Sequence, residues 1–152
     1  MSIGDTPLLR NVIRAWRLQR TGSMRDWIVQ LERRTKAFAE RTHGLCDELP
    51  GTTSVRTIAS QLARASGSVA ANHRAARRAR SDEELASKLQ IVSEEVDECV
   101  LWFELLDGKH VSHQARIDEL LDEARQLRAI FGRSLATLRR RIRDKRLRRR
   151  AR

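Results

Sequence analysis

The 152-residue sequence contains no tyrosine and little glycine, proline or cysteine. Seven Gly and two Pro leave few positions for tight turns, and aromatic residues make up 4% of the chain. β-Sheets favour β-branched and aromatic residues, whereas the Leu, Ala, Arg and Glu that abound here favour helices. We therefore expect an all-α protein, and the length suffices for one domain with a hydrophobic core.

Long apolar runs are also missing. No run approaches the roughly 20 residues that a membrane-spanning helix needs, and the N-terminus lacks the apolar segment of a signal peptide. The two cysteines, Cys46 and Cys99, stand inside apolar helical patterns without partners at metal-ligand spacing. Sparse cysteine is typical of reducing compartments. We expect a soluble cytoplasmic protein with no membrane contact, whose cysteines are small core residues.

Four successive segments carry apolar residues at alternating spacings of four and three, the period of an amphipathic helix. The expected inward stripes include Phe38 and Leu49 in the first segment, Leu85 and Phe103 in the third, and Phe131 in the fourth. The first expected helix spans Asp26–Leu49, and the later ones begin at Thr53 or Ser54, after Ser81 and after Ser112. Short turns place successive helices antiparallel. The sequence therefore predicts an all-α, antiparallel up-down-up-down four-helix bundle over residues 24–138, with a basic C-terminal extension.

Two serines are expected to cap these helices. Ser81 and Glu84 have the spacing of a capping box, in which each side chain bonds the free backbone N–H of the other residue. Ser112 occupies the N-cap position expected for the fourth helix.

The net charge of +11 is unevenly distributed. Residues 82–107 carry nine acidic and one basic side chain, whereas residues 139–152 carry ten basic and one acidic. Such a tail can neutralise several phosphates without reading a base sequence, although an arginine-rich terminus can also be disordered or merely solubilise a protein. The candidate nucleic-acid contacts in this tail are Arg139, Arg140, Arg141, Arg143, Lys145, Arg146, Arg148, Arg149 and Arg150.

We expect residues 1–23 to be a separate N-terminal appendage. Leu8, Leu9, Val12, Ile13 and Trp16 have the spacing of a short amphipathic helix surrounded by arginines. This pattern fits a partner or membrane-surface helix, a transit-like segment or a mobile appendage. Alternatively, Met24 is the true start of the protein.

A second basic cluster contains Arg74, Arg77, Arg78 and Arg80. The first three are expected to share one helical face, across which a phosphate backbone can lie. The same arginines can instead stabilise a helix C-terminus or pair with the acidic residues 82–84.

Three apolar residues of the acidic helix, Leu101, Trp102 and Leu105, lie off its main apolar stripe. Exposed residues of this kind suggest a subunit interface. The alternative is a wide core-facing stripe near the end of the bundle.

Two polar residues are expected to have structural roles. Asn72 lies on the inward face of the second helix, where its amide must find hydrogen bonds and fix packing or register. His73, beside the arginines, is expected at the surface or at an interface.

Catalytic and metal-binding patterns are weak. The sequence lacks a Gly-rich phosphate loop and a nucleophile elbow, and the neighbouring carboxylates Glu94, Asp97 and Glu98 suit a solvated or salt-bridged face. His110 and His113 have no third ligand at a convincing spacing. We expect a protein that is not an enzyme and that carries no metal or cofactor.

Residues 24–138 resemble the 23S rRNA-intervening sequence protein family of bacterial four-helix bundles, which includes accessory proteins of diversity-generating retroelements. The resemblance rests on the aromatic lead MRDWIVQLERRTKAF, Gln61-Leu62, the run Ser68-Val69-Ala70-Ala71-Asn72, and Glu98, which is similar to a recurrent glutamate of the family. Many members follow the Asn with an apolar residue and Ala-Glu-Gly, whereas HRAARRAR stands here.

This resemblance implies a homopentamer, because characterised members form five-subunit rings, and the retroelement relatives use a basic surface to engage RNA and a reverse transcriptase. We therefore expect an oligomer that binds nucleic acid, RNA more than DNA, and that serves a reverse transcriptase or a ribonucleoprotein. The alternative is a structural or adaptor ring that binds protein partners, with a tail that only solubilises it.

Overall fold

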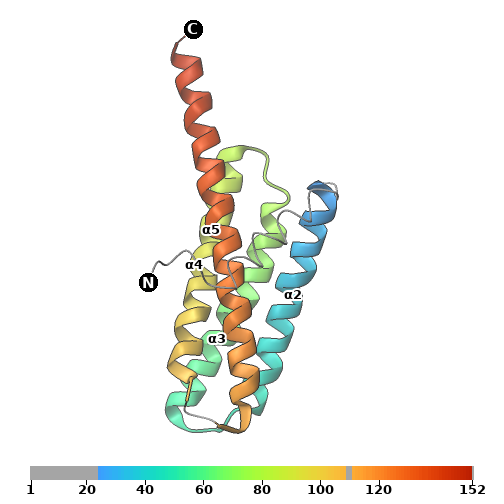
Figure 1. Cartoon of the computed structure of the whole chain (residues 1–152), viewed down its shortest axis with the longest axis vertical. Coiled ribbons are helices and arrows are strands. Elements are labelled where there is room, and N and C mark those ends of the chain that lie inside the picture. Colours follow the sequence, from blue (N-terminus) through green and yellow to red (C-terminus); the bar gives the residue numbers. More distant parts are fainter. Residues whose placement is uncertain (1–23, 109–110, 152) are drawn as a thin grey trace, which may run out of the picture. The chain divides into compact units, whose positions relative to one another are not determined.

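The computed structural model of the protein describes residues 24–108 and 111–151, and every regular element in these ranges is helical (Figure 1). The elements are α2 (Met24–Glu48), α3 (Thr53–Ala76), α4 (Asp82–Leu106), the 3-10 helix η2 (Val111–His113) and α5 (Gln114–Arg150). The predicted all-α class and its four long helices are confirmed. The amphipathic segment expected in residues 1–23 lies outside the described residues.

The described residues fall into two compact units, with the boundary between Arg34 and Thr35. The second unit contains the later part of α2 and all of α3, α4 and α5. All surfaces that bear on function below lie within this second unit. Among the helices described, none has both the length and the apolar character needed to span a membrane.

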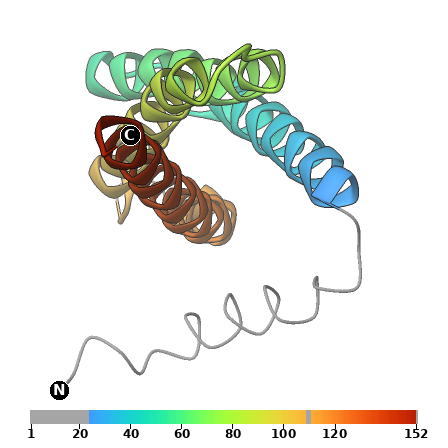
Figure 2. The same ribbon diagram turned by 90° about the horizontal axis from the view of Figure 1, so that it is seen from above.

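Within the second unit, α4 packs against both α3 and α5 (Figures 1 and 2). The ion pairs Asp82–Arg141, Asp97–Arg128 and Glu104–Arg125 join α4 to α5. Partner numbers fall along α5 as they rise along α4, so these two helices run antiparallel. The later part of α2 joins the others through Phe38, which packs on Phe103 of α4 with ring centroids 6.4 Å apart.

The apolar stripes predicted from the sequence form the core. Phe38, Phe103 and Phe131 are its largest fully buried side chains, and burying a side chain of this size contributes roughly 1.5–3 kcal/mol relative to exposure. Leu49 and Leu85, which belong to the predicted stripes, are only half-buried because they lie at helix ends.

His73 lies in the core, so the prediction of a surface or interface position is wrong. Its side chain is 5% exposed, and its ring packs edge-on against Phe131 with centroids 5.3 Å apart. The predicted inward residue Asn72 is only half-buried, and its Nδ2 donates to the carbonyl and hydroxyl oxygens of Ser68, both at 3.0 Å. The inward face of α3 therefore passes through position 73 in its last turn.

The start of α4 follows the predicted capping box in one of its two bonds. The backbone N–H of Glu84 donates to Ser81 Oγ at 3.0 Å. The Glu84 carboxylate, however, accepts from the backbone N–H of Arg80 at 2.8 Å. Glu84 thus ties the helix start to the turn that precedes it.

The predicted Ser112 cap is wrong. Residues Val111–His113 form a 3-10 turn, so α5 begins at Gln114 and His113 takes the N-cap position. The Ser112 hydroxyl bonds His113 Nδ1 at 3.0 Å instead of a helix N–H. The Gln114 side chain holds the turn, because its oxygen accepts from the Gly108 N–H at 3.1 Å, and Gly108 has a φ of 68°, which glycine tolerates.

Candidate nucleic-acid interface

The last part of α5 is helical and rich in arginine and lysine. α5 contains 37 residues and is about 55 Å long at 1.5 Å per residue, whereas α4 contains 25 residues. Residues 139–150, named the basic extension here, include nine Arg or Lys and one acid, Asp144. Of these twelve side chains, Ile142 is half-buried and the others are exposed.

Three cations of the basic extension, Arg141, Lys145 and Arg146, pair with acidic residues in the first turn of α4. Lys145 Nζ donates to Asp82 Oδ2 at 2.6 Å, and Arg141 bonds the other oxygen of the same carboxylate. Arg146 lies 3.8 Å from Glu83. Hydrogen bonds from Lys145 and then Arg141 lower the pKa of Asp82, because they stabilise its charged form.

Other cations of the basic extension, called the outer cations here because they have no such partner, are Arg140, Arg148, Arg149 and Arg150. Arg140, Arg148, Arg149 and Arg150 make no hydrogen bond or ion pair with any residue that the structure describes. Arg143 makes only a 4.0 Å contact with its neighbour Asp144. These guanidinium groups keep their donors available for an external anion.

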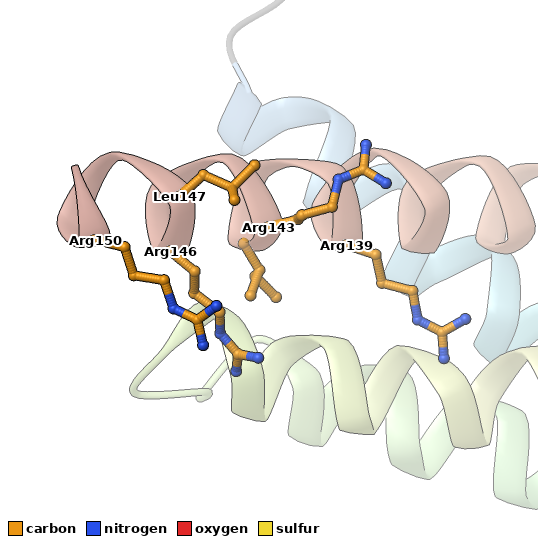
Figure 3. A pocket seen from close by; sticks show the side chains of 6 residues that line it. Arg139, Arg143, Arg146, Leu147 and Arg150 are labelled. Carbon is orange, nitrogen blue, oxygen red and sulfur yellow. The ribbon is translucent and has the colours of Figure 1, made fainter.

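Four arginines with the spacing i, i+4, i+7, i+11 share one face of the basic extension. They are Arg139, Arg143, Arg146 and Arg150, and together with Ile142 and Leu147 they line a surface groove (Figure 3). In Figure 3 the side chains of Arg139, Arg146 and Arg150 extend to the same side of the helix. A second groove on α5 is lined by Thr137, Arg140, Arg141, Asp144, Lys145 and Arg148.

The second basic cluster lies at the turn between α3 and α4. Because α3 ends at Ala76, only Arg74 belongs to the helix, Arg77 is its C-cap, and Arg78 and Arg80 follow in the turn. The prediction that Arg74, Arg77 and Arg78 share one helical face is therefore wrong. The turn leads directly into Asp82, so both predicted basic clusters lie at the same end of the second unit (Figure 1).

Glu98 and Arg64 connect α4 to α3 on another side of the unit. Arg64 bonds Glu98 and lies 3.5 Å from Glu95, and the Trp102 indole N–H donates to Glu98 at 3.1 Å. The hydrogen bond from Arg64 and then the one from Trp102 lower the pKa of Glu98. Glu98 is thus engaged in a structural network.

The predicted interface residues lie on the outer side of α4. Leu101 is 50% exposed and Leu105 is 42% exposed, whereas Trp102 is half-buried with its indole bonded to Glu98. A core-facing stripe does not account for Leu101 and Leu105. They form an apolar surface on this single chain.

The cysteines carry no nucleophilic signature. Cys99 is buried and Cys46 is half-buried, and both are free thiols. Burial, followed by the neighbouring Asp47, raises the pKa of Cys46 to about 11. Burial also raises the pKa of Cys99, so thiolate formation is suppressed at both.

Within the ranges 24–108 and 111–151, no group of three or more His, Cys, Asp or Glu side chains is arranged to hold a metal ion. His110 of the HxxH pair lies outside these ranges.

Asp82 is the residue of this candidate site that the sequence does not indicate. The sequence suggests it only as a partner of the nearby arginines, but it binds cations 59 and 63 positions further along the chain. Its position in the first turn of a helix predicts a favourable dipole interaction and gives no indication of the distant partners.

Comparison with known proteins identifies the bundle and leaves the basic extension unmatched. No curated protein and no solved structure matches the chain. The family model of the 23S rRNA-intervening sequence protein matches residues 29–133, more than half of the chain. This range covers α3 and α4 completely and stops before the basic extension begins. The chain belongs to the 23S rRNA-intervening sequence protein family.

Proposed function

We propose that this protein is a non-enzymatic, oligomeric four-helix bundle that binds nucleic acid through the basic extension and the turn with Arg74, Arg77, Arg78 and Arg80. The observation that carries the proposal is the helical basic extension, in which Arg140, Arg148, Arg149 and Arg150 have no partner among the described residues. RNA is preferred over DNA in this proposal because of the family to which the chain belongs.

Phosphate contacts account for such binding without any base reading. Each arginine that neutralises a phosphate releases condensed counterions, so the binding constant falls with salt concentration. Bases of single strands usually stack on aromatic side chains, and the residues lining the two grooves of α5 include no aromatic side chain. We therefore expect binding that is tight at low salt and tolerant of sequence.

The experiment compares two triple variants that change net charge equally. R140Q/R148Q/R150Q removes exposed cations of the basic extension, and R33Q/R56Q/R133Q removes exposed cations elsewhere. Gln has nearly the helix propensity of Arg, so the helices should persist. Binding of a labelled single-stranded RNA is measured by fluorescence anisotropy over a series of salt concentrations.

Loss of three phosphate contacts should reduce the slope of log binding constant against log salt by about 2 for single-stranded RNA. The control variant should keep the wild-type slope. Equal slopes for the two variants would refute the assignment of the site.

We further propose that the four helices form an up-down-up-down bundle that assembles into a cytoplasmic homopentamer. The antiparallel ion pairs between α4 and α5 support the topology. The exposed Leu101 and Leu105, with Trp102 between them, supply an apolar surface for a neighbouring subunit. A ring of five copies would multiply the positive field of the basic extensions.

In this proposal the ring serves as an accessory to a reverse transcriptase or another ribonucleoprotein. The apolar surface of Leu101 and Leu105 also favours a second candidate, an adaptor ring that binds protein partners. Affinity capture after nuclease treatment separates them. A protein partner retained without nucleic acid, together with the lack of salt-dependent RNA binding, would favour the adaptor.

A further inference from the structure

The Asp82 carboxylate pairs with two cations of the basic extension. Lys145 Nζ lies 2.6 Å from Asp82 Oδ2, and Arg141 bonds Asp82 Oδ1. The Asp82 side chain is 19% exposed, whereas its two partners are more than half exposed. The Asp82 carboxylate therefore bridges α4 to α5, while the cations remain accessible from solvent.

The Arg141 guanidinium and the Lys145 ammonium are groups that can also bind a phosphate. A phosphodiester presents two non-bridging oxygens with one negative charge, and a carboxylate presents two oxygens with the same charge. Arginine and lysine bind both kinds of anion. Because both cations are more than half exposed, solvent screens their attraction to Asp82 and the ion pairs contribute little net stability, so an incoming phosphate can replace the carboxylate at small cost.

We propose, on the basis of the function proposed above, that Arg141 and Lys145 form a phosphodiester-binding site and that Asp82 occupies it as an internal competitor. The outer arginines, including Arg148 and Arg150, bind nucleic acid without displacing any protein group. The inner pair binds only when the nucleic acid displaces Asp82. Asp82 thereby sets how many phosphates the basic extension engages and lowers its affinity.

The test variant is D82N, and D97N is its matched control. Both substitutions are isosteric and both remove one negative charge. Both also break contacts from α4 to α5: Asp82 has two ion pairs, and Asp97 has one, with Arg128 at 2.9 Å. Binding of single-stranded poly-uridine RNA is measured by fluorescence anisotropy over a series of salt concentrations.

Release of two cations in D82N should steepen the slope of log binding constant against log salt by about 1.4. D97N should leave the slope at the wild-type value. If charge alone matters, D82N and D97N will have equal slopes, and the competitor role of Asp82 is refuted.

R141Q/K145Q in the wild-type and D82N backgrounds closes the cycle, and its wild-type arm does not depend on D82N folding. R141Q/K145Q should change the RNA slope little in the wild-type background and should lower it by about 1.4 in the D82N background. A loss of that size already in the wild-type background would overturn the proposal, because Asp82 would then not block the site. R140Q/R148Q, which removes two outer cations, is the positive control.

The result also separates the two proposals. Salt-dependent RNA binding by the wild type with identical D82N and D97N slopes removes only the competitor role. Absence of RNA binding in the wild type and in D82N at low salt refutes both. Binding by D82N where the wild type binds far more weakly supports both.

Discussion

Acidification below about pH 6.5 is expected to destabilise the fold through His73. The imidazole is 5% exposed, it packs edge-on against Phe131, and its Nδ1 has no hydrogen-bond partner in the described part of the chain. Burial lowers the pKa of His73, because apolar surroundings disfavour the charged ring. The folded protein therefore takes up this proton less readily than the unfolded chain.

The direction and size of the effect follow from this difference in pKa. Stability contributed by a neutral buried histidine is present above the unfolded pKa and is lost as pH falls below it. The free energy of unfolding should fall by up to about 1.4 kcal/mol per pH unit below about pH 6.5, until the folded pKa is reached. A loss of about 1.4 kcal/mol lowers Tm by roughly 3–6 °C in a domain of this size.

The assay is thermal unfolding followed by far-ultraviolet circular dichroism between about pH 7.5 and 5.5, a window centred on the histidine pKa. H73Q should lose most of the pH dependence. H43Q is the control, since His43 is exposed and its Nε2 donates to the Ala63 carbonyl at 2.8 Å; it should retain the wild-type dependence. Asp82 and Glu98, whose pKa values are lowered, lose their contributions only below about pH 4.

An unchanged pH dependence in H73Q would refute the reasoning. So would a wild-type Tm that rises on acidification through this window, because protonation would then favour the folded state.

Two further predictions concern the core and the apolar surface of α4. F103A should lower the free energy of unfolding by about 3–5 kcal/mol, because Phe103 is fully buried against Phe38. L101A, at a 50% exposed position, should lower it by less than about 1 kcal/mol. Both values are measured by denaturant titration of the monomer. Similar losses for the two variants would contradict the assigned core. L101D/L105D should convert the proposed homopentamer into smaller species in multi-angle light scattering without lowering helix content, and a wild-type protein that is already monomeric would refute the assembly.

The sequence predicted the core well because burial follows a local period. Alternating spacings of three and four identified Phe38, Phe103 and Phe131 as inward residues, and all three are fully buried. Periodicity is less precise near helix ends, where neighbouring positions such as Asn72 and His73 lie almost equally close to the inward direction. The three-and-four spacing from Val69 favours Asn72, but packing against Phe131 places His73 inside.

The candidate site was only partly predictable. Runs of charged residues can be seen in the sequence, but their ion-pair partners are distant along the chain. The sequence predicted the arginine-rich tail and the Arg74–Arg80 cluster but could not predict that Asp82 binds Arg141 and Lys145 of the tail. The contact between Asp82 and Lys145 depends on the antiparallel register of α4 and α5. That register is set by the packing of two helices, which no short motif encodes.

The most direct test of the central claim is the salt dependence of RNA binding by the wild type and by the two triple variants. Wild-type protein should bind single-stranded RNA with a steep slope, which R140Q/R148Q/R150Q should reduce by about 2 and R33Q/R56Q/R133Q should leave unchanged. Binding that does not depend on salt, or that responds equally to both variants, would contradict the assignment of the basic extension as the nucleic-acid interface.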